Sequence, residues 1–394
     1  MPRFSTLSET TTRMSATSFG PFAARMKELA AAGRLAPLHL GDTWLPPPPA
    51  ARQLDLGDNP VHRYAPVDGL PELREAVAAR MTERHEIPTE SDGVLITPGS
   101  TGGLSIAVEA LFDPGDEVLL MTPSWPLIFG IFQRRGVVIN EVPVGLSGWP
   151  DDVEAFEARL RAAVTERTAG LYLCDPNNPC GFVYPEAYRD AIERVVLEHD
   201  LWLITDVAYL ELAWKDNGRI LPRRESLRSR TITAGTFSKI FALAGHRVGF
   251  LLVPEPARPV MTRLITHTTY HTSTSAQRLA LACLREGGEE PIARSYADGA
   301  RVTAEVLRAR FHPAEAGAFV FLDFRGLGLE THEQTLEFLG TCLDAGVALC
   351  PGRVFGERFA PFARLCFTTL PEDDLRAALE LLNPLLAGTL QPRA

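Results

Sequence analysis

The sequence predicts an α/β protein with a large domain, built on a mostly parallel seven-stranded sheet flanked by helices, and a smaller α+β domain. Seven short apolar runs alternate with helical patterns between residues 93 and 253. These runs are apolar throughout, which is typical of strands covered by helices on both faces. The chain of 394 residues is also long for a single core, and its pattern changes to long helices near residue 258.

The N-terminal elements precede this alternation. Residues 18–33 have the amphipathic pattern of a helix, and "APLHLGD" is expected to form a short strand that ends at Gly41. The proline-rich stretch "WLPPPPAARQLDLGDNP" predicts an irregular connector. Helix-forming residues dominate from 70 to 85, where Pro71 and Glu72 introduce the next helix.

The strands of the large domain are predicted from the apolar runs "GVLIT", "EVLLM", "VVINEV", "AGLYLC", "LWLIT", "TITAG" and "VGFLLV". Helices are predicted between most of them, at 101–112, 125–135, 151–163 and 185–198. In open parallel sheets, ligands bind beyond the carboxyl ends of the strands. The residues that directly follow each run are therefore the first candidates for a functional site.

The C-terminal part predicts the smaller domain. It contains the strand-like runs "AFVFLDF", "VALC" and "ARLCF", with helices near 331–344 and 371–386. We expect residues 45–280 to form the large domain and residues 1–44 and 281–394 to form the small one.

Charge and composition exclude several classes of protein. The net charge of −10, with no basic stretch to offset it, argues against a nucleic-acid partner. No apolar run approaches the ~20 residues that span a membrane, and the polar N-terminus lacks a signal-peptide core, so a cytoplasmic protein is expected. We interpret Arg223, Arg224, Arg228 and Arg230 as a solvated loop edge rather than a binding patch.

Six scattered cysteines show no CxxC pair and no metal-ligand spacing. Several of them lie inside apolar strand-like runs. They are expected to be buried free thiols in a reducing compartment, and no metal site is predicted.

Lysine is rare in this chain. Only three of its 39 basic residues are lysines, and one of them, Lys239, follows the run "TITAG" in apolar surroundings. Burial would lower the pKa of such an amine and make it a nucleophile toward an aldehyde, whereas the guanidinium of arginine stays protonated. The alternative is a surface lysine that extends its amine to solvent, which is how we interpret Lys27 and Lys215.

Four further segments carry polar residues at strand ends or inside apolar runs. "TPGSTGGL" (97–104) offers a helix N-terminus suited to a phosphate, or else a plain turn and cap. "DPNNPCG" (175–181) has the residues of an ordinary turn, and the alternative is that its Asn178 binds a ligand. Asp206, in "TDVAY", is either a helix cap or a charge that pairs with a cationic ring nitrogen. Arg364, in "FARLCF", needs an anionic partner if it is buried.

Taken together and in this order, these segments resemble the class I/II aminotransferases, which are fold-type I pyridoxal-phosphate (PLP) enzymes of the aspartate aminotransferase-like superfamily. The resemblance covers roughly residues 35–380. The motifs that carry it are "YAPVDGLPELR", "PGSTGG", "PGDEV", "PSWP", "NNPCG", "DVAY", "SKIFALAGHRVG", "PGRVFG" and "FARLCF". It implies that the large domain binds the cofactor.

The resemblance also implies roles at the cofactor ring. Lys239 would form the Schiff base with PLP and then act as the proton shuttle. Asp206 would pair with the pyridine nitrogen and keep it protonated, so that the ring can withdraw electrons. Tyr209 and Asn178 would hydrogen-bond the ring hydroxyl, and Trp125 would stack on the ring face.

The same resemblance implies which residues bind the phosphate of the cofactor. Ser100, Thr101, Thr236 and Arg247 would bind the phosphate. Tyr64 would reach the phosphate of a neighbouring subunit, which implies a homodimer.

By the same resemblance, Arg364 would clamp the substrate α-carboxylate, with Gly41 and Asn178 nearby. The chain departs from the family pattern at Cys180, where threonine is usual, and we expect mainly a local effect on turn packing. Residues 266–277 carry no clear specificity signature. A dicarboxylate substrate would need a second cation for its distal carboxylate. Arg63 is a candidate, but no second arginine is obviously placed for this role, so we favour a neutral substrate side chain.

The expected activity is transfer of an amino group between an L-amino acid and a 2-oxo acid. Because one fold hosts several reactions, the alternative is a PLP-dependent lyase, racemase or decarboxylase. A non-catalytic ligand sensor is a third hypothesis. Such sensors occur in regulators that attach this fold to an N-terminal DNA-binding module. The hypothesis is disfavoured because only about 35 residues precede the matching region and they are not basic.

Overall fold

The computed structural model describes residue 14 and residues 20–52, 55, 57, 59–145, 147–216, 218 and 220–387. Its helices are α2 (Ala23–Ala31), α3 (Pro49–Arg52), α4 (Pro71–His85), α5 (Gly99–Leu111), α6 (Leu127–Arg135), α7 (Val153–Ala162), α8 (Glu186–Glu198), α9 (Phe237–Ile240), α10 (Arg258–Thr268), α11 (Thr274–Glu286), α12 (Glu290–Val306), α13 (His332–Asp344) and α14 (Glu372–Ala387). Its strands are β1 (Val94–Thr97), β2 (Glu117–Thr122), β3 (Val138–Pro143), β4 (Thr168–Cys174), β5 (Trp202–Asp206), β6 (Thr231–Thr236), β7 (Gly249–Leu252), β8 (Phe319–Asp323), β9 (Cys350–Pro351) and β10 (Phe362–Cys366).

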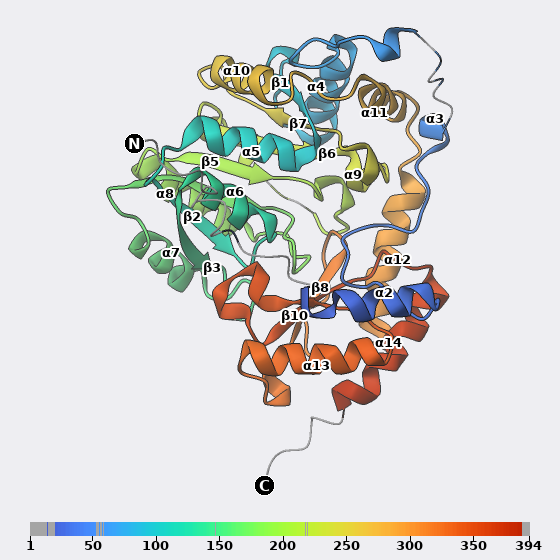
Figure 1. Ribbon diagram of the computed structural model, residues 1–394. Coiled ribbons are helices and arrows are strands. Elements are labelled where there is room, and N and C mark those ends of the chain that lie inside the picture. The colour runs from blue at the N-terminus through green and yellow to red at the C-terminus, as the bar shows by residue number, and fades with distance from the viewer. Residues whose placement is uncertain are drawn as a thin grey trace, which may run out of the picture.

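The larger sheet confirms the predicted α/β class. Within the described residues it has seven strands in the order β1-β7-β6-β5-β4-β2-β3. Strands β2 to β6 pair in parallel, whereas β7 runs antiparallel to β6 and β1. Helices α5, α6 and α10 pack on one face of this sheet and α7 and α8 on the other, as Figure 1 shows. This covering on both faces explains why the strands are apolar throughout.

The second sheet lies in the C-terminal part of the fold. In the described part of the chain its order is β8-β10-β9, and all its pairs are antiparallel. Helices α12, α13 and α14 bury their apolar faces against it in a separate core (Figure 1). The first sheet uses residues 94–252 and the second uses residues 319–366. Domain boundaries at 44/45 and 280/281 remain our proposal.

Three local predictions need correction. The segment "APLHLGD" is not a strand, since only an isolated bridge joins Ala36 to Val347. Leu38, the next residue whose N–H would face the partner segment, instead donates to the Ala36 carbonyl at 3.0 Å, so the chain turns away after this one bridge. In "VALC", only Cys350 enters a strand. The helix expected at 18–33 spans Ala23–Ala31 after a 3₁₀ turn from Gly20, and residues 18 and 19 lie outside the described residues.

Every helix in the described residues is too short or too polar to cross a lipid bilayer. The six cysteines are buried and form no disulfide, as the sequence predicts.

Candidate active site

A cavity of about 190 Å³ opens at the carboxyl ends of β4, β5 and β6. All the site residues predicted from the sequence line it except Tyr64. They are Gly41, Ser100, Thr101, Trp125, Asn178, Asp206, Tyr209, Thr236, Lys239, Arg247 and Arg364. The structure therefore gathers, at one edge of the sheet, residues that lie up to 323 positions apart in the sequence (Gly41 and Arg364).

Asp206 is the last residue of β5 and lines the cavity. It is only 4% exposed, and its Oδ1 accepts a hydrogen bond from the Ala208 N–H at 3.0 Å, while Tyr172 Oη donates to Oδ2 at 3.3 Å. Burial raises the pKa of Asp206 to about 6. Among the described residues no cation lies within ion-pair distance of this carboxylate. It is therefore available to a cationic group of a ligand.

Lys239 lies on α9, directly after β6, and points into the cavity from the end of the sheet. Its Nζ donates a short hydrogen bond to the carbonyl of Gly41. Burial lowers the pKa of this amine below its usual range, as its apolar sequence context predicts. Neutral lysine is a nucleophile, so the position suits covalent chemistry with an aldehyde.

The N-terminus of α5 and the turn around Arg247 form a polar pocket at one end of the cavity. Ser100 and Thr101 lie in the first turn of α5, where no side chain caps the free backbone N–H groups. Thr236 caps α9, and its Oγ1 donates to Ser238 Oγ at 2.9 Å. A helix N-terminus with hydroxyls and a nearby guanidinium is suited to a phosphate.

Glycines keep this polar pocket open. A Cβ on Gly99 would lie 2.6 Å from Arg247 Nη2, and Gly99 has a φ of +71° that other residues rarely adopt. A Cβ on Gly249 would lie 2.8 Å from the Ser100 nitrogen. These positions therefore require glycine for the close approach of β7 and Arg247 to α5.

Arg364 reaches the cavity from β10 of the second sheet. Its Nη1 donates to Asn178 Oδ1 at 3.0 Å and its Nη2 to the His39 carbonyl at 2.9 Å. Its guanidinium lies 4.2 Å from the centre of the Phe319 ring. Within the described residues its buried Nε has no hydrogen-bond partner, and no carboxylate forms an ion pair with it. A buried cation with unused donors is suited to a ligand carboxylate.

Tyr64 is the predicted site residue that this chain does not bring to its own cavity. Its side chain is 84% exposed and packs edge-on against Tyr270 and His271. Arg63, the candidate second cation, does not line the cavity either.

The sequence analysis missed five lining residues: Cys174, Ala208, Ser238, Ala244 and Phe319. Cys174 pairs with Asp206 across β4 and β5, so the strand-end rule that found Asp206 could also have found it. Ser238 lies next to Lys239 in the motif. Phe319 carries no sequence signal, because it is one apolar residue of a strand-like run.

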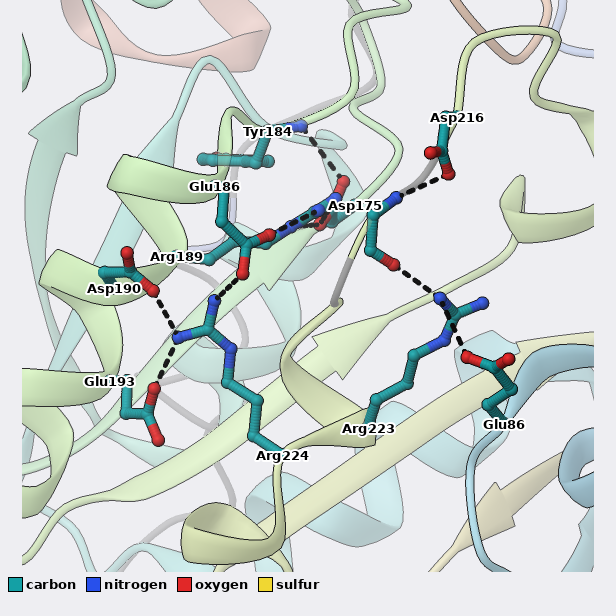
Figure 2. A network of polar contacts seen from close by, with 11 residues as sticks. Glu86, Asp175, Tyr184, Glu186, Arg189, Asp190, Glu193, Asp216, Arg223 and Arg224 are labelled. Atoms are coloured by element: carbon teal, nitrogen blue, oxygen red, sulfur yellow. Dashed lines mark hydrogen bonds and ion pairs between the residues drawn. The ribbon is translucent and has the colours of Figure 1, made fainter.

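The arginine cluster at 223–230 is corrected in part. Arg228 is exposed, as expected for a solvated loop edge. Arg224 is instead only 4% exposed and lies within ion-pair distance of Glu186, Asp190 and Glu193 of α8 (Figure 2). These three acidic residues of α8 compensate the buried charge of Arg224. They lie more than 30 positions earlier in the sequence, so the residues around Arg224 do not predict its burial.

The fold and the cavity together define an α/β enzyme with a buried lysine at the carboxyl edge of its sheet. The model of the family "Aminotransferase class I and II" matches residues 37–382. The chain belongs to this family and is an enzyme of the aminotransferase class. The family uses pyridoxal phosphate.

Relatives and solved structures agree with this assignment. The aspartate/prephenate aminotransferase of Thermus thermophilus is 31% identical over 338 residues, covering 81% of this chain and 82% of that protein. An aspartate aminotransferase of Streptomyces avermitilis is 31% identical over 384 residues, 92% of each chain. The structure of the T. thermophilus aspartate aminotransferase with maleate superimposes with a TM-score of 0.86 at 28% identity, covering 97% of this chain and all of that one.

The residues present fit pyridoxal phosphate. The cavity offers a buried amine for the aldehyde and a helix N-terminus beside Arg247 for the phosphate. For the ring nitrogen it offers a buried carboxylate, which has no ion-pair partner in the described part of the chain. The unpartnered Nε of Arg364 remains for a second ligand group.

Proposed function

We propose that this protein is a pyridoxal-phosphate-dependent aminotransferase that moves an amino group between an L-amino acid and a 2-oxo acid. The observation that carries the proposal is the position of Lys239. Its buried amine, with a lowered pKa, shares one cavity with the unpaired carboxylate of Asp206 and the incompletely satisfied guanidinium of Arg364.

In this proposal the chain holds the cofactor at several points. Lys239 Nζ would bind its aldehyde carbon covalently, and Asp206 would accept a hydrogen bond from the ring nitrogen. Tyr209 and Asn178 would bind the ring hydroxyl, and Trp125 would cover one ring face. The phosphate would bind to Ser100, Thr101, Thr236 and Arg247. When bound, the cofactor supplies an electron-withdrawing ring that stabilises negative charge at the substrate α-carbon.

Lys239 would also move the proton. The amino group of the substrate would displace Nζ from the aldehyde carbon and so leave it a free, neutral amine. Nζ would then accept the proton of the substrate α-carbon and deliver it to that former aldehyde carbon. Burial favours the neutral form by lowering the lysine pKa. Asp206 would stay ionised once a cation lies beside it, because an opposite charge lowers a carboxyl pKa that burial has raised.

Arg364 would bind the substrate α-carboxylate, with Gly41 and Asn178 beside it. The cations that line the cavity in the described residues are Lys239, Arg247 and Arg364, and two of them already have cofactor roles here. We therefore propose a neutral substrate side chain, although several relatives are named for aspartate. A comparison of kcat/KM for aspartate and for its neutral isostere asparagine tests this point, and a clear preference for aspartate would contradict it.

A homodimer completes the proposal. Tyr64 is an exposed aromatic residue away from its own cavity, as expected for a side chain that reaches the phosphate of a second subunit. Sedimentation of the purified protein tests the dimer. Weaker cofactor binding in Tyr64→Phe tests the contact of Tyr64 with the phosphate of the second subunit.

The first experiment is an absorbance spectrum of the cofactor-loaded protein, before and after addition of single L-amino acids without a 2-oxo acid. A lasting spectral change, with one equivalent of 2-oxo acid released per site, is expected. Continuous release of ammonia without an acceptor would instead indicate a lyase. A protein that takes up no pyridoxal phosphate would refute the role of Lys239.

A further inference from the structure

A buried ion pair lies directly behind the segment that carries Asn178. Arg189 of α8 is only 1% exposed and Asp175, the residue after β4, only 4%. Arg189 donates to Asp175 Oδ2 from Nε at 2.9 Å, and its Nη2 lies 2.7 Å from the same oxygen. Figure 2 shows the two side chains meeting between α8 and the end of the strand. Neither residue lines the cavity.

Asp175 is hydrogen-bonded to the end of β5 and to the far end of the segment that carries Asn178. Its backbone N–H donates to the carbonyl of Asp206 at 3.0 Å. Its Oδ1 accepts the N–H of Tyr184 at 3.2 Å, which closes the segment 175–184 on itself. Three residues after Asp175, the Oδ1 of Asn178 accepts from Arg364 at 3.0 Å. The orientation of Asp175 therefore influences where Asn178 meets the guanidinium.

Arg189 is in turn fixed from its other side. Its Nη1 lies 3.7 Å from Glu186, and the other carboxylate oxygen of Glu186 lies 2.8 Å from Arg224 (Figure 2). Arg224 also contacts Asp190 at 2.8 Å and so attaches α8 to the turn that precedes β6. Asp175 is thus held by a cation that itself has little freedom to move.

Stability alone does not account for this arrangement. Burying two charges costs so much desolvation that an apolar pair of similar volume is often equally stable. The ion pair adds direction, because Arg189 occupies one carboxylate oxygen and Tyr184 N–H the other, which fixes the rotation of the Asp175 side chain.

We propose that Arg189 is a positioning residue that acts through Asp175 and Asn178 to orient Arg364 toward the substrate α-carboxylate. The inference rests on the proposed function, since it needs Arg364 as the carboxylate clamp. It predicts that loss of Arg189 weakens substrate binding more than it slows the chemical step.

The test compares Arg189→Met with Arg224→Met. Both remove a deeply buried guanidinium from the same network, but among the contacts given for the described residues it is Arg189 that reaches the segment 175–184. We expect Arg189→Met to raise KM for both the amino acid and the 2-oxo acid about tenfold, with kcat within about twofold, because a small misplacement of a binding group has effects of this order. Arg224→Met removes only an indirect contact, which reaches Arg189 through Glu186, and should raise both KM values by no more than about twofold, even where it lowers the melting temperature.

A second measurement does not depend on turnover. Amide hydrogen exchange in the cofactor-free protein should become faster in residues 175–184 and 362–366 of Arg189→Met, but not of Arg224→Met. If Arg189→Met does not fold, Asp175→Asn replaces it, since it keeps the shape and an acceptor but removes the charge. Unchanged KM values in the variant that folds, or equal changes in Arg224→Met, would overturn the inference. An inactive wild-type protein would instead refute the proposed function, and the exchange of residues 362–366 would still report whether Arg189 is coupled to Arg364.

Discussion

The cations of the cavity differ from the cations of the network behind it. Lys239, Arg247 and Arg364 line the cavity, and within the described residues none of them forms an ion pair with a carboxylate. Arg189 and Arg224 are at least as deeply buried as Arg364, yet acidic residues surround both (Figure 2).

This difference separates functional from structural charge. A buried cation without an anion is costly, so it persists where a ligand supplies the missing charge. A buried cation that is fully paired serves the fold and has little left to offer a ligand. The presence of a carboxylate partner therefore distinguishes the two arginine environments better than burial does.

The largest expected effect concerns Lys239. Lys239→Ala should lower kcat by at least about a thousandfold, because it removes both the covalent attachment and the proton carrier. Lys215→Ala is the matched control, since Lys215 is exposed and pairs with Glu315, and it should stay within about 1 kcal/mol and twofold of wild type. Steady-state kinetics and thermal unfolding measure both variants. Full activity in Lys239→Ala would show that this cavity cation is not functional, and would contradict the comparison between the cavity and the network behind it.

The next effect is one of stability and concerns the network. Arg189→Leu should lower the free energy of unfolding by about 3–5 kcal/mol, because Asp175 is left buried and charged without its partner. Replacing Asp175 by Ser in the same chain should restore much of the loss. Urea unfolding of the single and double variants tests this coupling, and equal losses in both would show that the charge of Asp175 is not the cause.

The unpaired carboxylate of Asp206 gives a pH-dependent prediction. Burial raises its pKa to about 6, against roughly 3.9 in an unfolded chain, so the native cofactor-free protein holds this proton more tightly. The contribution of Asp206 to the free energy of unfolding should therefore fall by roughly 3 kcal/mol as the pH rises from about 4 to about 6, and stay constant above that. The Asp206→Asn variant has no carboxyl group at this position, so its free energy of unfolding should lack this pH-dependent contribution. Parallel stability curves for the variant and wild type across this range would contradict it.

Arg364 gives a smaller effect on free energy, which appears in binding rather than in stability. Arg364→Leu should raise KM for the amino donor roughly 10- to 100-fold, the value of one charge-assisted contact. Its free energy of unfolding should fall less than that of Arg189→Leu, since two neutral acceptors, Asn178 Oδ1 and the His39 carbonyl, lose a donor but no carboxylate loses a partner. Arg364→Lys should recover only part of the affinity, because lysine lacks the planar fork. Severe destabilisation of Arg364→Leu would place Arg364 with the structural arginines.

Much of the fold could be predicted because the signals are local. Apolar runs such as "LWLIT" and the helical patterns between them correspond to β5 and its neighbours, since a strand buried on both faces must be apolar along its whole length. The strand-end rule likewise identified Asp206, Asn178 and Lys239. Arg364 was noticed only because an arginine is unusual among strand-forming apolar residues.

By itself, the sequence determined which residues could carry the chemistry and where along the chain they lie. The tertiary structure decided which charges are left without a partner. Arg224 lies in a turn that suggests solvent, yet three carboxylates on α8 surround it. Asp175 and Arg189 are 14 residues apart, and only the packing of α8 against β4 brings them together. The pairing of a charge depends on groups that are distant in sequence, and local patterns do not record them.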